Sequence, residues 1–355
     1  MANKKALIGM SGGVDSSVSA YLMLRRGFDC IGATMRLYTG REDGTCCSLE
    51  DVEDARSVAS RMGIPFYVFN FSEDFEQKVM APFVRCYQSG LTPNPCIECN
   101  RHLKFDRFLR RARELECDLV VTGHYARICQ LPNGRYCLQK AVDESKDQTY
   151  FLYTMTQDQL AHTCFPLGAL TKAEVRRIAE EQGFINARKR DSQDICFVPD
   201  GDYMAFLERY TGEKGIPGDF LDEEGNVVGT HRGAAAYTLG QRKGLGLAMG
   251  APIYVTGKDM AANTVTVGPN GSLFHAALVA DDWNWAAFET LTQPIRCKAK
   301  ARSRMTEQPA TVYPLEDGRC RVVFDEPQRA ITPGQAVVLY DDDIVLGGAT
   351  IMEVL

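Results

Sequence analysis

The seven residues Ser11-Gly12-Gly13-Val14-Asp15-Ser16-Ser17 stand where a buried strand should pass into a helix. Residues 6–10 are apolar and predict a strand buried on both faces, and residues 18–26 are helix-forming. The first N–H groups of a helix have no intrachain acceptor, so a turn at that point attracts an anion. The two glycines let the backbone approach a phosphate group closely, and the three serines offer hydroxyl donors. The stretch therefore predicts a phosphate-binding loop rather than a turn with ordinary serine caps.

This loop matches neither of two familiar nucleotide motifs. It lacks the Gly-Lys-Ser/Thr of a Walker A loop, so the lysine that would reach the outer phosphates is missing. It also lacks the G-x-G-x-x-G spacing of a dinucleotide fingerprint. It resembles the pyrophosphate-binding loop of the N-type ATP pyrophosphatases, which activate a carbonyl oxygen by adenylation. That resemblance implies ATP with Mg²⁺ as cofactors and a role for Asp15 in positioning the metal-bound phosphates. It fits both amidating ligases and tRNA-sulfurating enzymes.

Length and composition narrow the class of protein. A chain of 355 residues exceeds what one core usually supports, so two or three domains are expected. No stretch approaches the roughly 20 apolar residues of a membrane span, and residues 1–5 lead directly into a core strand. We therefore expect a cytoplasmic protein without a membrane partner. The formal charge of −6 weighs only mildly against nucleic acid, because binding depends on local basic stripes.

Strand and helix patterns alternate through the first half of the chain. Apolar strands are predicted at 30–35, 65–71 and 118–122, and helices at 48–62, 72–90 and 100–116. Such alternation predicts a doubly wound parallel sheet of the α/β class, whose ligands bind beyond the carboxyl ends of the strands. The loop, Met35 and Gly123-His124 should then meet in one crevice. The expected ATP-binding residues are Gly9, Met10, Ser11, Gly12, Gly13, Val14, Asp15, Ser16, Met35 and Gly123.

The pattern changes after about residue 200. Gly and Pro become frequent there, and from Leu278 onward almost every segment reads as a short strand. Strands are predicted at 295–301, 310–313, 320–324, 336–340 and 344–352, with regular turns that favour a small antiparallel β-barrel. We therefore expect three parts, which are an ATP-pyrophosphatase domain at 1–200, a small central domain at 201–274 and the barrel at 275–355.

The 13 cysteines are too few and too irregularly spaced for a disulfide scaffold, so some should be catalytic or metal-binding. Cys96 and Cys99 form a C-x-x-C at the start of a predicted helix, where the helix dipole favours thiolate, and Cys196 is a third candidate. The pair alone fits half a zinc site, a redox pair or two unrelated cysteines. Adjacent Cys46 and Cys47 are poor joint ligands for one metal. The others are expected to be buried as small hydrophobes, namely Cys30, Cys86, Cys117, Cys129, Cys137, Cys164, Cys297 and Cys320.

Short motifs spread along the chain carry a specific resemblance to a known family. They are 10–16, Thr92-Pro93-Asn94-Pro95, Cys99-Asn100, Lys104-Phe105, Thr122-Gly123-His124-Tyr125, Lys146-Asp147-Gln148, Asp191-Ser192, Cys196-Phe197 and 237–242. In order and spacing they resemble the bacterial tRNA-uridine 2-sulfurtransferases, also called tRNA 2-thiouridylases. The resemblance implies an α/β nucleotide domain, a central domain and a barrel that helps hold tRNA. It also implies ATP-dependent replacement of the 2-carbonyl oxygen of the wobble uridine by sulfur, in tRNAs of the Lys, Glu and Gln type.

The same resemblance assigns roles to single residues. The cysteine matching Cys196 carries a persulfide, and Cys99 attacks it or releases its terminal sulfur, after which the two can form a disulfide. A cysteine desulfurase or a sulfur-relay protein would supply the sulfur. Asn94 and Pro95 would contact the target base. The implied tRNA-binding residues are Asn94, Pro95, Cys96, His124, Lys146, Asp147, Gln148, Arg302, Ser303 and Gln335.

Cys96 departs from the family pattern, because many members carry an aspartate at this position. With a thiol here, Cys96, Cys99 and Cys196 could ligate a [4Fe-4S] cluster whose fourth iron holds a hydrosulfide that attacks the activated base. The cluster and the persulfide relay predict the same product from the same cysteines. The sequence leaves both open, with structural zinc as a third reading.

Two basic stripes favour nucleic-acid binding. One lies on a predicted helix, where an ordinary solvated face is the simpler reading, and the other alternates along a predicted barrel strand. Five like charges on one strand face repel unless an anion neutralises them. Arg188-Lys189-Arg190 could extend the same surface. The helix set is Arg101, Lys104, Arg107, Arg110, Arg111 and Arg113, and the strand set is Arg296, Lys298, Lys300, Arg302 and Arg304.

Two alternatives come from other functional classes. An amidating or argininosuccinate-type ligase would share the loop but leave the C-x-x-C, Cys196 and the basic barrel without a role. A non-enzymatic iron–sulfur or nucleotide-sensing module would bind tRNA without modifying it. ATP consumption that depends on tRNA and releases pyrophosphate separates both from thiolation.

Overall fold

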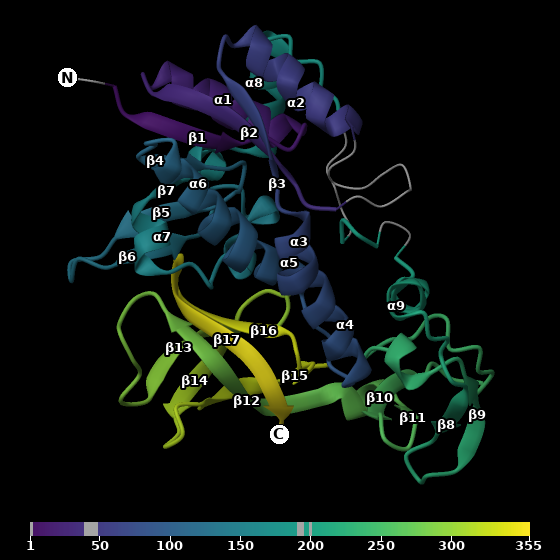
Figure 1. Cartoon of the computed structure of the whole chain (residues 1–355). Helices are drawn as coiled ribbons and strands as arrows, with labels where there is room; N and C mark the ends of the chain where they lie inside the picture. The colour runs from purple at the N-terminus through teal and green to yellow at the C-terminus, as the bar shows by residue number, and fades with distance from the viewer. Residues whose placement is uncertain (1–2, 39–48, 190–194, 199–200) are drawn as a thin grey trace.

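A five-stranded parallel sheet forms the centre of the first part of the molecule (Figure 1). The computed structural model describes residues 3–38, 49–189, 195–198 and 201–355. The strand order is β3-β2-β1-β4-β7, and all neighbours run parallel. The strands are β1 (Lys5–Gly9), β2 (Asp29–Arg36), β3 (Phe66–Asn70), β4 (Leu119–Val121) and β7 (Thr163–Cys164).

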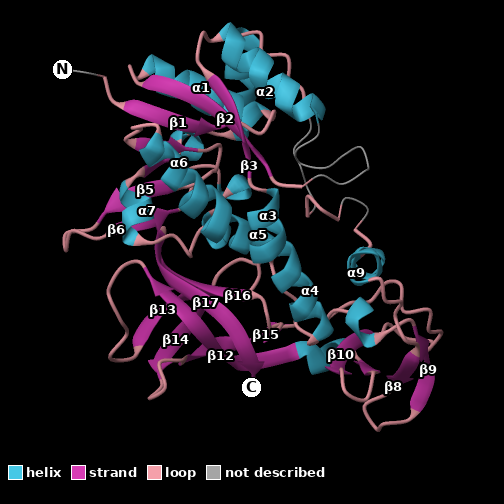
Figure 2. Cartoon of the chain, viewed as in Figure 1, coloured by secondary structure: helices cyan, strands magenta, loops and turns pink. Residues whose placement is uncertain are grey.

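Helices cover both faces of this sheet (Figure 2). Ala6 and Ile8 of β1 face one layer and Leu7 faces the other, as the strand period of two requires. The first layer holds α1 (Val14–Arg25), α2 (Leu49–Arg61) and α8 (Lys172–Glu181). The second holds two long helices, α3 (Ser72–Phe75) to α4 (Ala81–Gln88) and α5 (Pro95–Cys99) to α6 (Phe108–Glu114), which π-helical segments at Glu76–Met80 and Asn100–Arg107 make continuous. The predicted doubly wound α/β class is confirmed.

A hairpin that the sequence did not reveal joins the first part to the last. β5 (Arg127–Gln130) and β6 (Tyr136–Gln139) pair antiparallel, and Gln139 pairs with Ile344 of the barrel. Directly after β6, the mostly buried Lys140 forms an ion pair with Glu307. Four-residue strands are too short to show an alternating pattern. α7 (Gln157–Ala161) follows the hairpin and contacts β6.

The central part is a small four-stranded sheet. α9 (Tyr203–Thr211) precedes β8 (Gly218–Leu221), β9 (Val227–His231), β10 (Tyr254–Asp259) and β11 (Thr264–Gly268), which lie in the order β10-β11-β8-β9. Phe220, Val255 and Val265 form its core and are fully buried.

The last part is a closed antiparallel barrel. Six strands pair in the order β12-β15-β14-β13-β16-β17, and β12 also pairs with β17, which closes the sheet. They are β12 (Phe274–Trp285), β13 (Ile295–Lys300), β14 (Gln308–Pro314), β15 (Cys320–Arg329), β16 (Ala336–Asp341) and β17 (Ile344–Val354). Inward side chains such as Val322 and Leu339 are fully buried. The predicted barrel is confirmed.

The strand that was predicted to carry five basic residues is too short to hold all of them. β13 ends at Lys300, so Arg302, Ser303 and Arg304 lie in the following turn. Arg302 turns inward and donates to the carbonyl oxygen of Ala330 and to Thr332 Oγ1. Burial and the neighbouring Arg329 lower the pKa of Arg302 below its usual value. The prediction of a five-membered basic face was therefore wrong, because the alternation continues past the residue where the chain leaves the sheet.

The basic helix is largely neutralised by carboxylates. Arg110 and Arg111 pair within the helix, with Asp106 and Glu114. The other pairs reach different elements and are Arg101–Asp282, Arg107–Asp74 and Arg113–Asp158. The helix therefore presents a solvated, paired face, which was its simpler reading.

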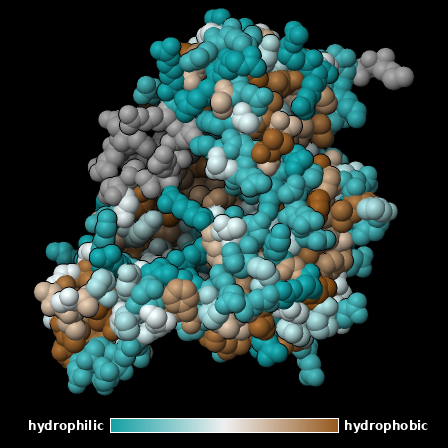
Figure 3. Space-filling model, turned by 180° about the vertical axis from the view of Figure 1, so that it is seen from behind, coloured by the Kyte–Doolittle hydropathy of each residue, from teal (hydrophilic) through white to brown (hydrophobic). Residues whose placement is uncertain are grey.

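The face of the molecule that is turned away in Figure 1 is mostly hydrophilic (Figure 3). Seen from behind, it has a hollow near its centre in whose depth apolar residues are visible (Figure 3). None of the helices in the described part of the chain combines the length and the apolar character that a membrane crossing requires.

Candidate active site

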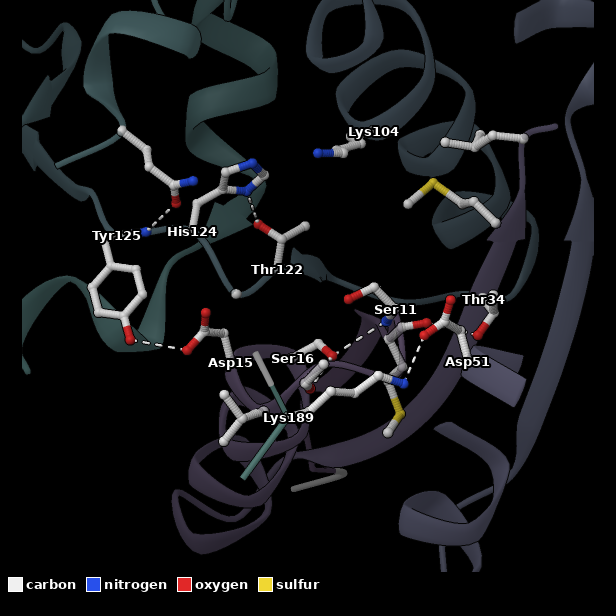
Figure 4. Close-up of a pocket in the computed structure, with 18 of the residues that line it drawn as sticks. Ser11, Asp15, Ser16, Thr34, Asp51, Lys104, Thr122, His124, Tyr125 and Lys189 are labelled. Atoms are coloured by element: carbon white, nitrogen blue, oxygen red, sulfur yellow. Dashed lines mark hydrogen bonds and ion pairs between the residues drawn. The ribbon is translucent and has the colours of Figure 1, made fainter. Parts of the chain in front are cut away.

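A cavity of about 450 Å³ opens at the carboxyl ends of β1, β2 and β4 (Figure 4). This cavity is the crevice that the sequence predicted, since the loop, Met35 and Gly123 all line it. Every predicted nucleotide residue is in its wall except Gly12. The wall also holds residues that sequence reasoning did not place there, which are Thr34, Leu37, Asp51, Lys104, Thr122, Tyr125 and Lys189.

The two loop glycines have different tasks. Gly12 has φ +75°, and a Cβ there would overlap the backbone carbonyl of Asp51, so only glycine fits. Gly13 is the N-cap of α1 with φ −89° and ψ 160°, which any residue adopts. A Cβ at Gly13 has only Ser11 Oγ nearby, at 3.5 Å, because the position faces the cavity. The fold thus requires glycine at position 12. At position 13 the absence of a side chain keeps the cavity open.

The loop serines mainly hold the loop itself. Ser16 Oγ accepts from the N–H of Ser11 at 3.2 Å and donates to the Gly13 carbonyl at 3.0 Å. The fully buried Ser17 also donates to that carbonyl, at 3.1 Å. Buried Asn186 donates from Nδ2 to the Gly12 carbonyl and to Ser17 Oγ, each at 2.9 Å. Two of the three predicted hydroxyl donors are therefore engaged inside the loop, and the helix N–H groups remain as the main anion donors.

Asp15 is held by two partners from distant parts of the chain. The Tyr125 hydroxyl donates to Asp15 Oδ1 at 2.9 Å, and Lys172 Nζ lies 2.8 Å from both carboxylate oxygens. Lys172 is the first residue of α8, whose N-cap Thr171 forms a capping box with Glu174. The carboxylate thus has a fixed direction at the cavity wall.

Lys189 forms a second ion pair in the cavity wall. Its ammonium lies 2.7 Å from Asp51 Oδ1 and 2.6 Å from Asp54 Oδ2. Partial burial lowers the pKa of Lys189, but the two carboxylates raise it further, so the net pKa lies above its usual value. Arg188 is 92% exposed, whereas Arg190 lies outside the described residues. Lys189 therefore lines the cavity, where its charge is paired with two carboxylates.

Three of the residues expected to touch tRNA line the same cavity, namely His124, Lys146 and Gln148. His124 Nδ1 lies 2.7 Å from Thr122 Oγ1, and burial together with Lys104 holds the His124 pKa well below 6.5, so the ring is neutral. Gln148 Oε1 accepts from the N–H of Tyr125 at 2.9 Å.

Asp147 points the other way. Its carboxylate accepts from the N–H of Ala141 at 3.0 Å and from Thr149 Oγ1 at 2.6 Å, and burial raises the pKa of its carboxyl group. Both carboxylate oxygens are thus engaged in holding the 141–149 segment, so Asp147 positions this segment of the chain.

Cys99 and Cys196 pack against one apolar cluster beside the cavity. Cys99 is buried in the cluster of the second helix layer, and the half-buried Cys196 packs on it. Met35 and Leu37 contact this cluster and also line the cavity. The two thiols that are distant in sequence thus both contact the apolar cluster that borders the cavity.

The C-x-x-C does begin a helix. Asn94 is the N-cap of α5, and its Oδ1 accepts from the N–H of Cys96 at 3.1 Å, with Pro95 as the first helical residue. Cys96 is exposed while Cys99 is buried.

Among the described residues, no group of three His, Cys, Asp or Glu side chains is arranged to hold a metal ion. The arrangement therefore does not fit a three-cysteine cluster. Cys46, Cys47 and residues 190–194 lie outside the described residues.

The other eight cysteines are poor nucleophiles. Five are buried, and Cys86, Cys129 and Cys164 are half-buried. Burial raises the pKa of all eight thiols above the usual value, to about 11 for Cys30. Thiolate chemistry is therefore disfavoured at each of them.

Gln335 connects the barrel to the segment before the C-x-x-C. Its side-chain amide donates to the Thr92 carbonyl at 2.6 Å. The N–H of Thr92 donates to the Pro333 carbonyl at 3.0 Å. The segment that carries Asn94 and Pro95 is thus positioned by the barrel.

Comparisons with known proteins cover the whole chain. Three family models match in succession, described as the tRNA methyl transferase HUP domain (4–200), the tRNA methyl transferase PRC-barrel domain (204–269) and the aminomethyltransferase beta-barrel domain (275–351). The tRNA-specific 2-thiouridylase MnmA of Clostridioides difficile is 49% identical, with 98% of each chain covered. That of Acetivibrio thermocellus is 50% identical over 99% of this chain and 100% of its own.

Solved structures are more distant. A 4-thiouridine synthetase in complex with RNA and ATP is 20% identical, with a TM-score of 0.37 over 55% of this chain and 45% of that chain. The full-length relatives carry the family name that the motifs of this sequence suggested, and the fold has an α/β part, a central part and a barrel. The chain therefore belongs to the family of tRNA-specific 2-thiouridylases, which are tRNA sulfurtransferases.

Proposed function

We propose that this enzyme uses ATP to replace the 2-carbonyl oxygen of the wobble uridine by sulfur, in tRNAs of the Lys, Glu and Gln type. One observation carries the proposal. The helix that begins at Pro95 places Cys99 in the cluster on which Cys196 packs and Lys104 in the wall of the loop cavity. One continuous helix thus links the proposed phosphate site to the apolar cluster that both thiols contact.

The first step activates a poor leaving group. The uridine O2 attacks the α-phosphorus of ATP, a C2–O–P bond forms, N3 loses its proton, and pyrophosphate departs. The N–H groups at the start of α1 bind the phosphates and stabilise the charge that develops on them. Mg²⁺ would accompany the ATP phosphates, and the Asp15 carboxylate in the cavity wall is the kind of oxygen ligand that it prefers.

The second step delivers sulfur. Cys196 carries a persulfide loaded by a cysteine desulfurase or a sulfur-relay protein. The Cys99 thiolate attacks the inner sulfur, a Cys99–Cys196 disulfide forms, and hydrosulfide leaves. Hydrosulfide then attacks C2 of the adenylated base, the C2–O bond breaks, AMP departs, and the sulfur-borne proton moves to N3. A dithiol reductant restores the two thiols for the next turnover.

This route is preferred to the cluster because the described cysteines do not gather as three ligands. Cys96 then has no sulfur-carrying task. At the position of N2 in α5 it contributes its backbone N–H to the Asn94 cap. We infer that the enzyme acts in the cytoplasm on tRNA bound across the α/β domain and the barrel.

The barrel contribution to tRNA binding is testable on β13. Lys298 and Arg296 are both exposed on one face of this strand, but Arg296 is tied to Asp325 in a bidentate ion pair. Lys298→Ala should lower the salt slope of tRNA binding by about one unit, and Arg296→Ala by clearly less. Filter binding at several salt concentrations measures both slopes. If both variants kept the wild-type salt slope, this face of the strand would be solvated and would not contact tRNA.

The proposed reaction is tested in cells and with purified enzyme. Nucleosides from a strain that lacks the gene should contain no wobble 2-thiouridine, and the gene should restore it, as measured by mass spectrometry. An amidating ligase would leave these nucleosides unchanged. Purified enzyme should release pyrophosphate only with tRNA present, whereas a sensing module would release none.

A further inference from the structure

The loop lacks the lysine that a Walker A motif aims at the outer phosphates. Adenylation nevertheless expels pyrophosphate, a strongly anionic leaving group, so a cation near the loop would favour the transition state. Three lysines from different segments line the cavity, namely Lys104, Lys146 and Lys189. Of these, Lys189 is joined to the glycine turn by contacts of both its side chain and its backbone segment.

The side chain of Lys189 is fixed beside Gly12. Its ammonium binds Asp51 at 2.7 Å, and the backbone of Asp51 lies against the position where Gly12 would carry a Cβ. In the close-up, Lys189 extends past Ser16 towards Asp51, at the loop end of the cavity (Figure 4). The ammonium therefore lies in the cavity wall, held by a residue whose backbone packs on the glycine turn.

The backbone of Lys189 is fixed to the same loop. Its N–H donates to the Asn186 carbonyl at 3.0 Å, and the Asn186 side chain donates to the Gly12 carbonyl at 2.9 Å. Asn186 is only 2% exposed. A turn of four residues thus connects the loop to the lysine, so the distance between the two cannot vary freely.

We propose that Lys189 binds the β- and γ-phosphates of ATP and neutralises the pyrophosphate as it leaves. An ammonium has three N–H donors, and Asp51 and Asp54 receive two of them. The third donor is then available to a phosphate oxygen at the cavity wall. The two carboxylates keep the ammonium charged and aimed at the loop. The proposal rests on the proposed use of ATP in this cavity.

The test compares ligands with and without the outer phosphates. In Lys189→Met, calorimetry should show ATP and free pyrophosphate, each with Mg²⁺, binding roughly 10- to 100-fold more weakly. AMP should bind within about twofold of wild type, because AMP has no outer phosphates. Lys189→Arg should recover most of the ATP affinity. The control is Arg188→Met, which removes a neighbouring cation that is 92% exposed and should leave all three affinities unchanged.

Each outcome decides the matter. Unchanged ATP affinity in Lys189→Met, or equal weakening of ATP and AMP, would overturn the proposal, the latter by showing a structural role. A wild-type protein that binds no ATP would instead refute the proposed function. If the loss of the ammonium beside Asp51 and Asp54 prevents Lys189→Met from folding, the double variant Lys189→Met/Asp54→Asn removes one negative charge and is measured with Asp54→Asn as its reference.

Discussion

Cys99→Ser should eliminate 2-thiouridine formation, and so should Cys196→Ser, because each removes one of the two thiols that must react together. Both pack against the cluster that also contacts Met35 and Leu37 of the cavity. The double variant should be no worse than either single variant, as expected for residues that act as a unit. Pyrophosphate release in a first turnover should persist in all three variants, since adenylation precedes sulfur transfer.

Two control variants sharpen this result. Cys86→Ser changes a half-buried thiol that is a poor nucleophile, because burial raises its pKa. This variant should therefore keep nearly full activity. Cys96→Ser should keep much of its activity when iron-free enzyme is supplied with ATP and a cysteine desulfurase. Brown anaerobic protein with about four irons per chain, whose iron and activity both vanish in Cys96→Ser, would replace the relay with the cluster. Full activity in Cys196→Ser would refute the shared thiol site.

The second large effect separates the two loop glycines. Gly13→Val should abolish ATP binding and adenylation while leaving thermal stability and tRNA affinity close to wild type, because its side chain enters the open cavity. Gly12→Ala should instead destabilise the fold by about 1–3 kcal/mol or more, since φ is +75° there and Asp51 blocks the added methyl group. Thermal melts and calorimetry with ATP measure the two properties.

Two results would contradict these roles of the loop glycines. If Gly13→Val retained pyrophosphate release at the wild-type rate, the loop would not hold the phosphates. If Gly12→Ala melted at the wild-type temperature, the close approach of the Asp51 backbone would not constrain the turn.

The parts of the fold with strong local patterns could be predicted from the sequence. A run of apolar residues at β1, a glycine turn and helix formers give the loop its position without reference to any distant residue. The barrel strand β13 alternates between exposed and buried side chains, so its two faces are readable from the sequence. The hairpin β5–β6 was missed because its strands have only four residues each, too few to show an alternating pattern.

The partners of the loop could not be predicted, because they come from distant segments. Lys172 reaches Asp15 across 157 positions, and Lys189 reaches Asp51 across 138. In the sequence these lysines look like ordinary surface charges, one in a helix and one in a basic triplet. The same limit applies to Arg302 and Asp147, which look exposed in the sequence but turn inward to backbone and hydroxyl partners.

The central claim is that the uridine 2-oxygen is adenylated before sulfur replaces it. The most direct test is a single turnover with tRNA carrying ¹⁸O at the wobble-uridine O2, ATP and a persulfide donor, followed by mass spectrometry of the released AMP. The account predicts one ¹⁸O atom in each AMP and one AMP for each 2-thiouridine formed. Unlabelled AMP accompanying the thiolated product would contradict it.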